Sequence, residues 1–330
     1  MAGVLEKVES FVMARFAKLL VAAISSAIVS ANVLAFMQAR AMTRFIETGA
    51  RTGRPERLSI LDKLGVVLSG VSIPRPQSLV TPAHYNLVFE TIYLTNRSGD
   101  RLETWHIPGR DDGPIVLMYH GYAVSKSTLL ATARAIKQLR YGTLLVDFYG
   151  AGGSSGSGTT IGVKEADDVA ASVDYAKSRW PQRRIVLYGI SMGGAALLRA
   201  MAVGGVKADG VIIEAVFDSL LNTAKNRFRS MGLPPSPFTE LLLFWGSVQQ
   251  GFNYFAHDPA QYAAKVECPL LILHGEDDQR ATLAEARTIA AALGERGRLV
   301  AFPGVPHMAI VDARREEWMK EVEQFLQPLQ

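Results

Sequence analysis

A serine flanked by glycines occupies a position where it could act as a nucleophile. The pentapeptide at 189–193, Gly-Ile-Ser-Met-Gly, follows an apolar run that ends at Tyr188 and precedes a segment rich in alanine and leucine. A strand, this motif and a helix in that order form a nucleophile elbow, which exposes the serine hydroxyl on a sharp turn. The glycines prevent side-chain collisions there, and the helix dipole favours developing negative charge. We therefore predict that Ser191 is a nucleophile.

A serine hydroxyl needs a neighbouring base to take its proton, and histidine is the usual base. The chain contains six histidines, of which His307 follows the last apolar run and a Phe-Pro-Gly turn. This order places His307 on a loop at the carboxyl edge of a parallel sheet, where ligands bind in open α/β folds. We expect His307 to be the base. The others lie early in the chain or are expected to order turns and strand ends: His84, His106, His120, His257 and His274.

The base in turn needs a carboxylate that fixes its tautomer and stabilises the imidazolium. Three acidic residues follow His274-Gly275 directly, at the end of a predicted strand and ahead of His307 in the chain. Asp278 is our first choice, Asp277 the second, and Asp218, at the end of the preceding strand, the third. Alternatively, these acids only cap the next helix, because acidic residues favour helix starts.

An acyl transfer also needs donors for the oxyanion of the tetrahedral intermediate. The backbone N–H of Met192, directly after the nucleophile, is one expected donor. Tyr122 follows the apolar run 115–119 and a His-Gly pair, and we expect its backbone N–H to be the second. Tyr122 could instead contribute only its ring, as part of a pocket wall.

Other classes of chemistry find little support in the sequence. The basic residues are scattered without an aromatic-interleaved stripe, so nucleic acid is not an expected partner. Cys268 is the only cysteine and is interpreted as a small buried hydrophobe. The Gly/Ser stretch at 150–158 lacks the Lys-Ser/Thr ending of a phosphate-binding loop. No metal-ligand spacing is present, and we expect neither metal nor cofactor.

The pattern of apolar runs predicts an α/β fold. An early hairpin is expected from 88–94 and 102–107, and six further strands are expected near 115–119, 143–147, 184–188, 210–216, 269–273 and 298–302. Helices are expected near 125–140, 163–179, 192–203, 283–293 and 312–327. Such alternation is typical of a mostly parallel sheet flanked by helices. A helical cap of about 219–266 fits the long interval between two strands, and its apolar side chains could pack onto the domain or line a pocket.

The amino-terminal region has a different composition, because residues 19–39 carry no charge. This length suits a transmembrane helix, although the polar residues within it also allow interfacial insertion or a soluble helix. Small residues recur every four positions, at Ala23, Ala27, Ala31 and Ala35, which favours close helix packing or a homodimer. Arginines follow the stretch more densely than basic residues precede it (Arg40, Arg44, Arg51, Arg54 and Arg57). We expect a membrane-associated protein with a cytoplasmic catalytic domain, or a cytoplasmic protein.

Several motifs together resemble the α/β-hydrolase superfamily, in particular esterase-like and serine-aminopeptidase-like members with a small helical cap. They are the elbow, His120-Gly121, the segment 147–156 that begins Asp-Phe-Tyr-Gly, and His274-Gly275 followed by Asp278. The resemblance spans about 87–330 and implies Ser191 as nucleophile, Asp278 as acid and His307 as base, with oxyanion donors at Tyr122 and Met192. Pro306 precedes His307 where many relatives have glycine. We predict a helix and connector at 1–85 and a catalytic domain at 86–330.

These observations predict a serine hydrolase that cleaves small apolar carboxylic esters, as a carboxylesterase or lipase does. A serine aminopeptidase or an acyltransferase is the alternative enzyme, because the same residues attack amides and thioesters. A membrane-tethered scaffold with an inactive hydrolase fold is the alternative from a different class. The presence of serine, acid and histidine together argues against the scaffold.

Overall fold

The computed structural model describes residues 2–53 and 58–329. An eight-stranded sheet forms its centre, in the order β1-β2-β4-β3-β5-β6-β7-β8. β2 runs antiparallel to β1 and β4, and the remaining neighbours are parallel. The strands are β1 (Glu90–Thr95), β2 (Arg101–Ile107), β3 (Ile115–Tyr119), β4 (Gly142–Val146), β5 (Ile185–Ile190), β6 (Gly210–Glu214), β7 (Leu270–Gly275) and β8 (Gly297–Phe302).

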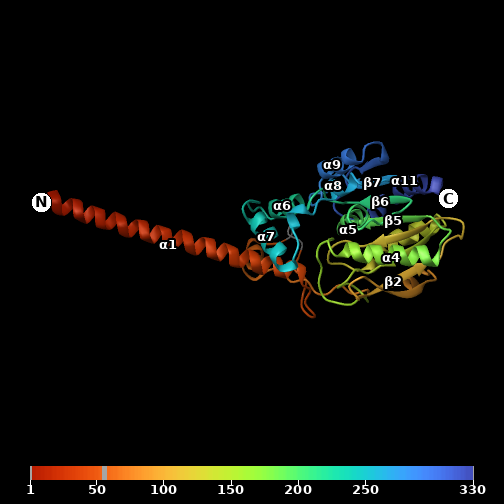
Figure 1. Ribbon diagram of the computed structural model, residues 1–330, viewed down its shortest axis with the longest axis horizontal. Coiled ribbons are helices and arrows are strands. Elements are labelled where there is room, and N and C mark those ends of the chain that lie inside the picture. Colours follow the sequence, from red (N-terminus) through yellow and green to blue (C-terminus); the bar gives the residue numbers. More distant parts are fainter. Residues whose placement is uncertain (1, 54–57, 330) are drawn as a thin grey trace.

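Helices cover both faces of this sheet (Figure 1). One face packs against α4 (Glu165–Arg179), α5 (Met192–Ala202), α8 (Pro259–Ala263) and α9 (Leu283–Leu293). The other face packs against α3 (Leu130–Gln138), α10 (Ile310–Ala313) and α11 (Arg315–Leu326). Single 3₁₀ turns lie at η2 (Pro82–Tyr85), η3 (Lys126–Leu129), η4 (Tyr254–Ala256), η5 (Gly294–Arg296) and η6 (Gln327–Leu329). The predicted fold, a mostly parallel sheet between helical layers, is confirmed.

The central strands are apolar on both sides because both sides are covered. Every residue of β3, β4 and β6 is buried. In β3, Ile115, Leu117 and Tyr119 belong to the core on one face, whereas Val116 and Met118 belong to the core on the other. Alternation along a strand sends successive side chains to opposite faces. Continuous apolar runs are therefore the expected signature of these strands.

The predicted strand boundaries differ from the observed ones by at most two residues. The last predicted helix, 312–327, differs more, because the structure divides this region into α10 and α11. Arg314 separates them with an extended φ of −138°. The break turns the chain from the loop that carries His307 into the helix that covers the sheet.

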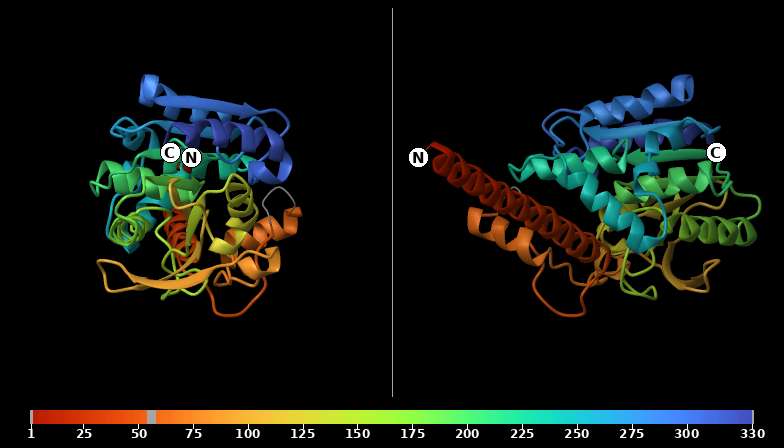
Figure 2. Two further views of the ribbon diagram at one scale, coloured as in Figure 1. Left: turned by 90° about the vertical axis from the view of Figure 1, so that its right-hand side faces the viewer. Right: turned by 60° about the vertical axis from the view of Figure 1, so that its left-hand side comes forward.

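The helices outside this body gather at one end of the molecule (Figures 1 and 2). α6 (Leu220–Ser230) and α7 (Phe238–Gln250) lie within the predicted cap, between β6 and β7. α1 (Ala2–Thr43) is a single long helix that projects away from the sheet, and its last turns contact α7 and α2 (Ile60–Ser69). Arg54 and Arg57 of the predicted basic run lie outside the described residues.

Candidate active site

Ser191 occupies the turn between β5 and α5. Its backbone has φ 51° and ψ −115°, a conformation that costs free energy for any residue except glycine. The backbone N–H of Ser191 donates to the carbonyl of Glu214 at 2.8 Å, which ties the turn to the end of β6. Ser191 is half-buried and begins a helix. The hydroxyl therefore stands at a helix amino terminus on the carboxyl edge of the sheet.

Three glycines make this turn possible by removing side chains from crowded positions. A Cβ at Gly189 would lie 2.5 Å from the backbone nitrogen of Gly194, and one at Gly193 would lie 2.4 Å from the carbonyl oxygen of Tyr119. At Gly194 a Cβ would lie 2.2 Å from Val216. Gly194 is a further residue of the turn, beyond those predicted from the sequence, and its position beside Gly193 was the available signal. The strained turn is held by close packing on both neighbouring strands.

His307 and Asp278 contact each other at the same edge of the sheet. Nδ1 of His307 lies 2.7 Å from Oδ2 of Asp278. The other carboxylate oxygen accepts hydrogen bonds from the backbone N–H groups of Arg280 at 2.8 Å and Ala281 at 3.0 Å. The Asp278 side chain is fully buried, whereas the His307 side chain is 22% exposed. Because Nδ1 donates to the carboxylate, Nε2 of His307 remains available as a proton acceptor.

The second and third choices for the acid lie elsewhere. Asp277 is exposed, and only its backbone N–H is directed toward the histidine loop, where it donates to the carbonyl of Val305 at 3.1 Å. Asp218 accepts hydrogen bonds from Asn222 at 3.0 Å and Ser219 at 3.1 Å, and so stabilises the start of α6. The structure thus brings Asp278 to His307, and neither Asp277 nor Asp218.

The buried histidines at strand ends order backbone. Nε2 of His120 accepts a hydrogen bond from the Phe148 N–H at 3.2 Å, and Nδ1 donates to the Gly121 carbonyl at 2.8 Å. Nε2 of His274 donates to the Ala281 carbonyl at 2.8 Å. Burial lowers the pKa of both rings, and burial together with Arg199 lowers the pKa of His257 to about 3. These three histidines are therefore neutral near pH 7.

The residues predicted to supply the oxyanion donors belong to two segments that adjoin Ser191, the start of α5 and the loop after β3. Met192 supplies the first N–H of α5, a group that has no acceptor within its own helix. The loop after β3 lies against the serine, since a Cβ at Gly121 would be 3.7 Å from the Cβ of Ser191. The Tyr122 hydroxyl donates to the carbonyl of Met42 at 2.6 Å, so its ring binds the last turn of α1. Burial raises the pKa of Tyr122 to about 12, which keeps this donor protonated.

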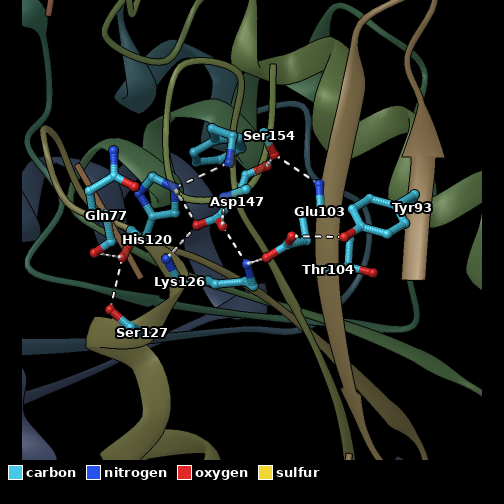
Figure 3. Close-up of polar contacts among 12 residues, drawn as sticks. Gln77, Tyr93, Glu103, Thr104, His120, Lys126, Ser127, Asp147 and Ser154 are labelled. Atoms are coloured by element: carbon cyan, nitrogen blue, oxygen red, sulfur yellow. Dashed lines mark hydrogen bonds and ion pairs between the residues drawn. The ribbon is translucent and has the colours of Figure 1, made fainter. Parts of the chain in front are cut away.

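A buried ionic cluster joins the loop after β3 to the loop after β4 (Figure 3). Nζ of Lys126 contacts Glu103 at 2.7 Å and also Asp147, and the Lys126 N–H donates to Asp147 at 2.7 Å. The Lys126 and Asp147 side chains are fully buried. The cluster fixes the loop that carries Gly121 and Tyr122. Lys126 is not among the residues predicted from the sequence, because a lysine in a polar segment gives no sign of burial.

Glu214 connects the nucleophile strand to the histidine loop. Its carboxylate is fully buried and accepts hydrogen bonds from the Tyr188 hydroxyl at 2.6 Å, the Ile310 N–H at 2.7 Å and the Trp318 indole at 3.0 Å. Ile310 lies three residues after His307. This role of Glu214 is not among the sequence predictions, although a glutamate inside the apolar run 210–216 was the available signal.

Among residues 2–53 and 58–329, no group of three or more His, Cys, Asp or Glu side chains is arranged to hold a metal ion. A cavity of about 310 Å³ lies over β2, lined among others by Glu103, Trp105 and Gly153. It adjoins the ionic cluster and not the serine. The sheet edge holds a hydroxyl on a strained turn and an imidazole bonded to a buried carboxylate.

Comparisons with known proteins agree with this architecture. The model of the prolyl oligopeptidase family matches residues 154–329. The α/β hydrolase domain-containing protein WAV2 of Arabidopsis thaliana is 27% identical over 274 residues, which cover 79% of this chain and 85% of WAV2. The lysophosphatidylserine lipase ABHD12 of Xenopus tropicalis is 26% identical over 180 residues, covering 50% of this chain and 43% of that protein. The esterase Pf2001 of Pyrococcus furiosus superposes with a TM-score of 0.65 at 23% identity, over 77% of this chain and 96% of the esterase.

Proposed function

Because this chain belongs to the prolyl oligopeptidase family, within the α/β-hydrolase superfamily, we propose that it is a serine hydrolase that cleaves carboxylic esters through an acyl-enzyme. The observation that carries the proposal is the 2.7 Å contact between His307 and the buried Asp278. This pair lies on the same sheet edge as the strained turn of Ser191. A hydroxyl, an imidazole and a carboxylate are the groups that acyl transfer needs.

Each group then has a defined part in the reaction. Nε2 of His307 takes the proton as the Ser191 hydroxyl attacks the ester carbonyl, and later gives it to the leaving alcohol. Asp278 holds the tautomer and stabilises the imidazolium. The N–H groups of Met192 and Tyr122 bind the oxyanion, and one such donor contributes about 3 to 4 kcal/mol in comparable sites. In the second half of the reaction, water attacks the acyl-enzyme with His307 again as the base, and the carboxylic acid is released as Ser191 recovers its proton.

Ester substrates with apolar acyl chains are supported by two lines of argument. The Pyrococcus furiosus protein that shares this fold is an esterase, and the Xenopus tropicalis relative is a lysophosphatidylserine lipase. In this chain, the cap helices α6 and α7 carry apolar side chains beside the sheet edge, including Phe228, Phe238 and Leu243. An acyl chain needs such a surface in order to leave water.

A serine aminopeptidase is the second candidate, because the matching family is one of oligopeptidases. A peptidase that recognises a free amino terminus needs a carboxylate to pair with the substrate's ammonium group. Three carboxylates at this sheet edge already have partners: Asp278 binds His307, Asp218 binds Asn222, and Glu214 binds Ile310. Glu276 and Asp277 are exposed at the same edge, so the carboxylates alone do not select the ester substrate.

We also propose that α1 attaches the enzyme to a membrane. Within Ser10–Thr43, the most apolar 18-residue window has a mean hydropathy of 2.2, and 6% of that window is buried in the structure. A core helix of this composition would be covered by the protein. Of the small-residue row, Ala23 and Ala27 are exposed and Ala31 and Ala35 half-buried; one turn later, the buried Ala39 lies next to Gly246 of α7. Flotation of the full chain with lipid vesicles tests this attachment, and a soluble monomer that stays at the bottom of the gradient would contradict it.

The catalytic proposal is tested by labelling and turnover of the full chain. An activated fluorophosphonate probe should label the wild type but not Ser191→Ala, and turnover of a nitrophenyl ester should fall by about 10⁴-fold or more in that variant. Ser98→Ala is the matched control, because Ser98 is exposed in the turn between β1 and β2. Folded wild-type protein that neither labels nor cleaves any ester would favour the inactive scaffold. Faster turnover of aminoacyl amides than of esters would favour the aminopeptidase.

A further inference from the structure

The helix α2 exposes apolar side chains where a water-facing helix carries polar ones. Leu61, Leu64 and Leu68 are 79%, 55% and 64% exposed, and their spacing places them on one face of α2. Lys63 points the other way, and its Nζ donates to the carbonyl of Met231 at 3.1 Å. Lys63 therefore contacts the end of α6, whereas the leucines face outward. This is the reverse of the usual amphipathic arrangement.

The cap helix α7 shows the same pattern. Phe244 and Val248, one turn apart, are 50% and 56% exposed. Leu243 on the inner side is buried. Trp245 and Gln249 face α1: the Trp245 indole donates to Asn32 at 3.1 Å, and Gln249 donates to the carbonyl of Phe36 at 2.8 Å. α7 thus uses its polar groups to bind α1 and leaves apolar groups outside.

Both helices contact α1 near its carboxyl end, and α2 and α7 lie on two sides of it (Figure 2). α7 binds Asn32 and Phe36, and Gln38 donates to the carbonyl of Val67 on α2 at 2.9 Å. We call the exposed side chains Leu61, Leu64, Leu68, Phe244 and Val248 the collar. The collar side chains come from α2 and α7, the two helices that contact α1 where it enters the body of the protein.

The length of α1 places the collar relative to a bilayer. The uncharged stretch 19–39 measures about 30 Å at 1.5 Å per residue, which equals the hydrocarbon thickness of about 30 Å. Contacts with α7 and α2 occupy its last part, from Asn32 to Gln38. When the uncharged stretch fills the hydrocarbon region, the collar cannot remain in water. It must lie inside the leaflet nearest to the catalytic domain.

We infer that the collar is immersed in that leaflet, so that α1, α2 and α7 together form the membrane-binding surface. Burial of exposed leucine, phenylalanine and valine side chains in lipid is favourable, and a tryptophan such as Trp245 is typical of the membrane interface. Arg40 and Arg44 follow the uncharged stretch directly and are suited to phospholipid phosphates. The occupant of this surface is therefore a lipid leaflet.

This placement has a consequence for the substrate, which rests on the proposed function. Met42, one turn after the uncharged stretch, accepts the hydrogen bond from Tyr122 beside Ser191. The Tyr122 hydroxyl therefore contacts α1 about 5 Å, along the helix, beyond the end of that stretch, and the loop with the proposed oxyanion donor is joined to this position by the tyrosine side chain. The ester carbonyl of an acyl lipid sits at the same depth, near the headgroups. The substrate class is an acyl lipid drawn directly from the leaflet.

A quenching experiment on the full chain tests the immersion. In a Cys268→Ser background, single cysteines at Leu64→Cys and Val248→Cys carry an environment-sensitive dye in phosphatidylcholine vesicles with doxyl-labelled lipid. Ile24→Cys on α1 is the positive control. Val203→Cys is the negative control, because Val203 is 59% exposed just after α5, at the opposite edge of the sheet. We expect quenching at positions 24, 64 and 248 and none at 203.

Quenching at 24 alone would overturn the inference, because α1 would then cross the bilayer with the collar in water. Shielding of 64 and 248 without lipid quenching would also overturn it and would indicate a second copy of the chain as occupant. Absence of quenching at 24 would overturn both the anchor and the collar.

Turnover separates the substrate source from the chemistry. The triple variant Leu61→Ser, Leu64→Ser and Leu68→Ser should cleave a soluble short-chain ester at the wild-type rate. Its cleavage of lysophospholipid in vesicles should fall by about tenfold, because the collar no longer holds the site at the leaflet. Unchanged lipid cleavage would refute the leaflet as the source. Absence of soluble-ester cleavage by the wild type would refute the proposed function, whereas the quenching result would still test the immersion of the collar.

Discussion

The carboxyl edge of the sheet buries polar side chains, whereas the collar exposes apolar ones. At the sheet edge, the carboxylates of Glu214 and Asp278 are buried, and each finds hydrogen-bond donors within the chain. In the collar, apolar side chains such as Leu61 are exposed, with no covering element among residues 2–53 and 58–329. Buried polar groups need partners, whereas exposed apolar surfaces often mark contact sites. The polar groups of the sheet edge find their partners within the protein, whereas we propose a lipid leaflet as the partner of the collar.

The two regions also differ in how firmly their geometry is held. The turn at Ser191 is fixed by glycines that leave no room for a Cβ, and the loop beside it by the buried pair Lys126 and Asp147. The collar side chains of α7 stand on a helix that is joined to α1 by hydrogen bonds of Trp245 and Gln249. Substitutions should therefore disturb chemistry and stability at the sheet edge and membrane contact at the collar.

The largest expected effect is a difference in kcat between variants of two adjacent aspartates at the sheet edge. Asp278→Asn should lower kcat for a nitrophenyl ester by about 10⁴-fold, because the amide no longer holds the histidine tautomer that accepts the serine proton. Asp277→Asn should leave kcat within about twofold, because Asp277 is exposed. Steady-state kinetics of both variants, together with circular dichroism to confirm folding, makes the measurement. Equal losses in the two variants would show that the 2.7 Å contact is not the one that serves catalysis.

The same chemical change in the two regions should have very different effects on stability. Leu187→Ala in β5 removes a fully buried side chain and should lower the free energy of unfolding by about 2 to 5 kcal/mol. Leu64→Ala in the collar removes a side chain that is 55% exposed and should change it by about 0.5 kcal/mol or less. Urea denaturation of the full chain in detergent micelles compares them. A large loss in Leu64→Ala would mean that the collar packs against the protein and is not open to lipid.

A smaller effect should appear in the pH dependence of stability. Burial raises the pKa of Glu214 above its usual value, against the opposing hydrogen bonds from Tyr188, Ile310 and Trp318. The folded protein thus keeps a proton that the unfolded chain releases above about pH 4.5, so the free energy of unfolding decreases as pH rises from there to the folded-state pKa. Glu214→Gln has no such proton, and its stability should decline less over this range. Denaturation of both proteins between pH 4 and 8 measures the slopes, and parallel curves would contradict the assignment.

Much of the fold and of the candidate site could be predicted because the signals are local. The strands appear as short apolar runs, and the elbow motif follows one of them directly, at Ser191. His307 was predicted from its place after the last strand. Lys126 was not predicted, because its burial depends on Glu103 and Asp147, which lie on other strands or loops. Nor was the outward face of α2, because the spacing of its leucines predicts a helix without telling which side the protein covers.

The sequence by itself therefore determined the order of the elements, the α/β fold and the residue types that acyl transfer requires. It did so because hydrophobic periodicity and turn chemistry act over a few residues. The tertiary structure decided that Asp278 rather than Asp277 meets His307, that Glu214 joins two strand ends to the histidine loop, and that the leucines of α2 face outward beside α1. Each of these facts depends on which distant segments pack together, a choice made by the burial of the whole chain.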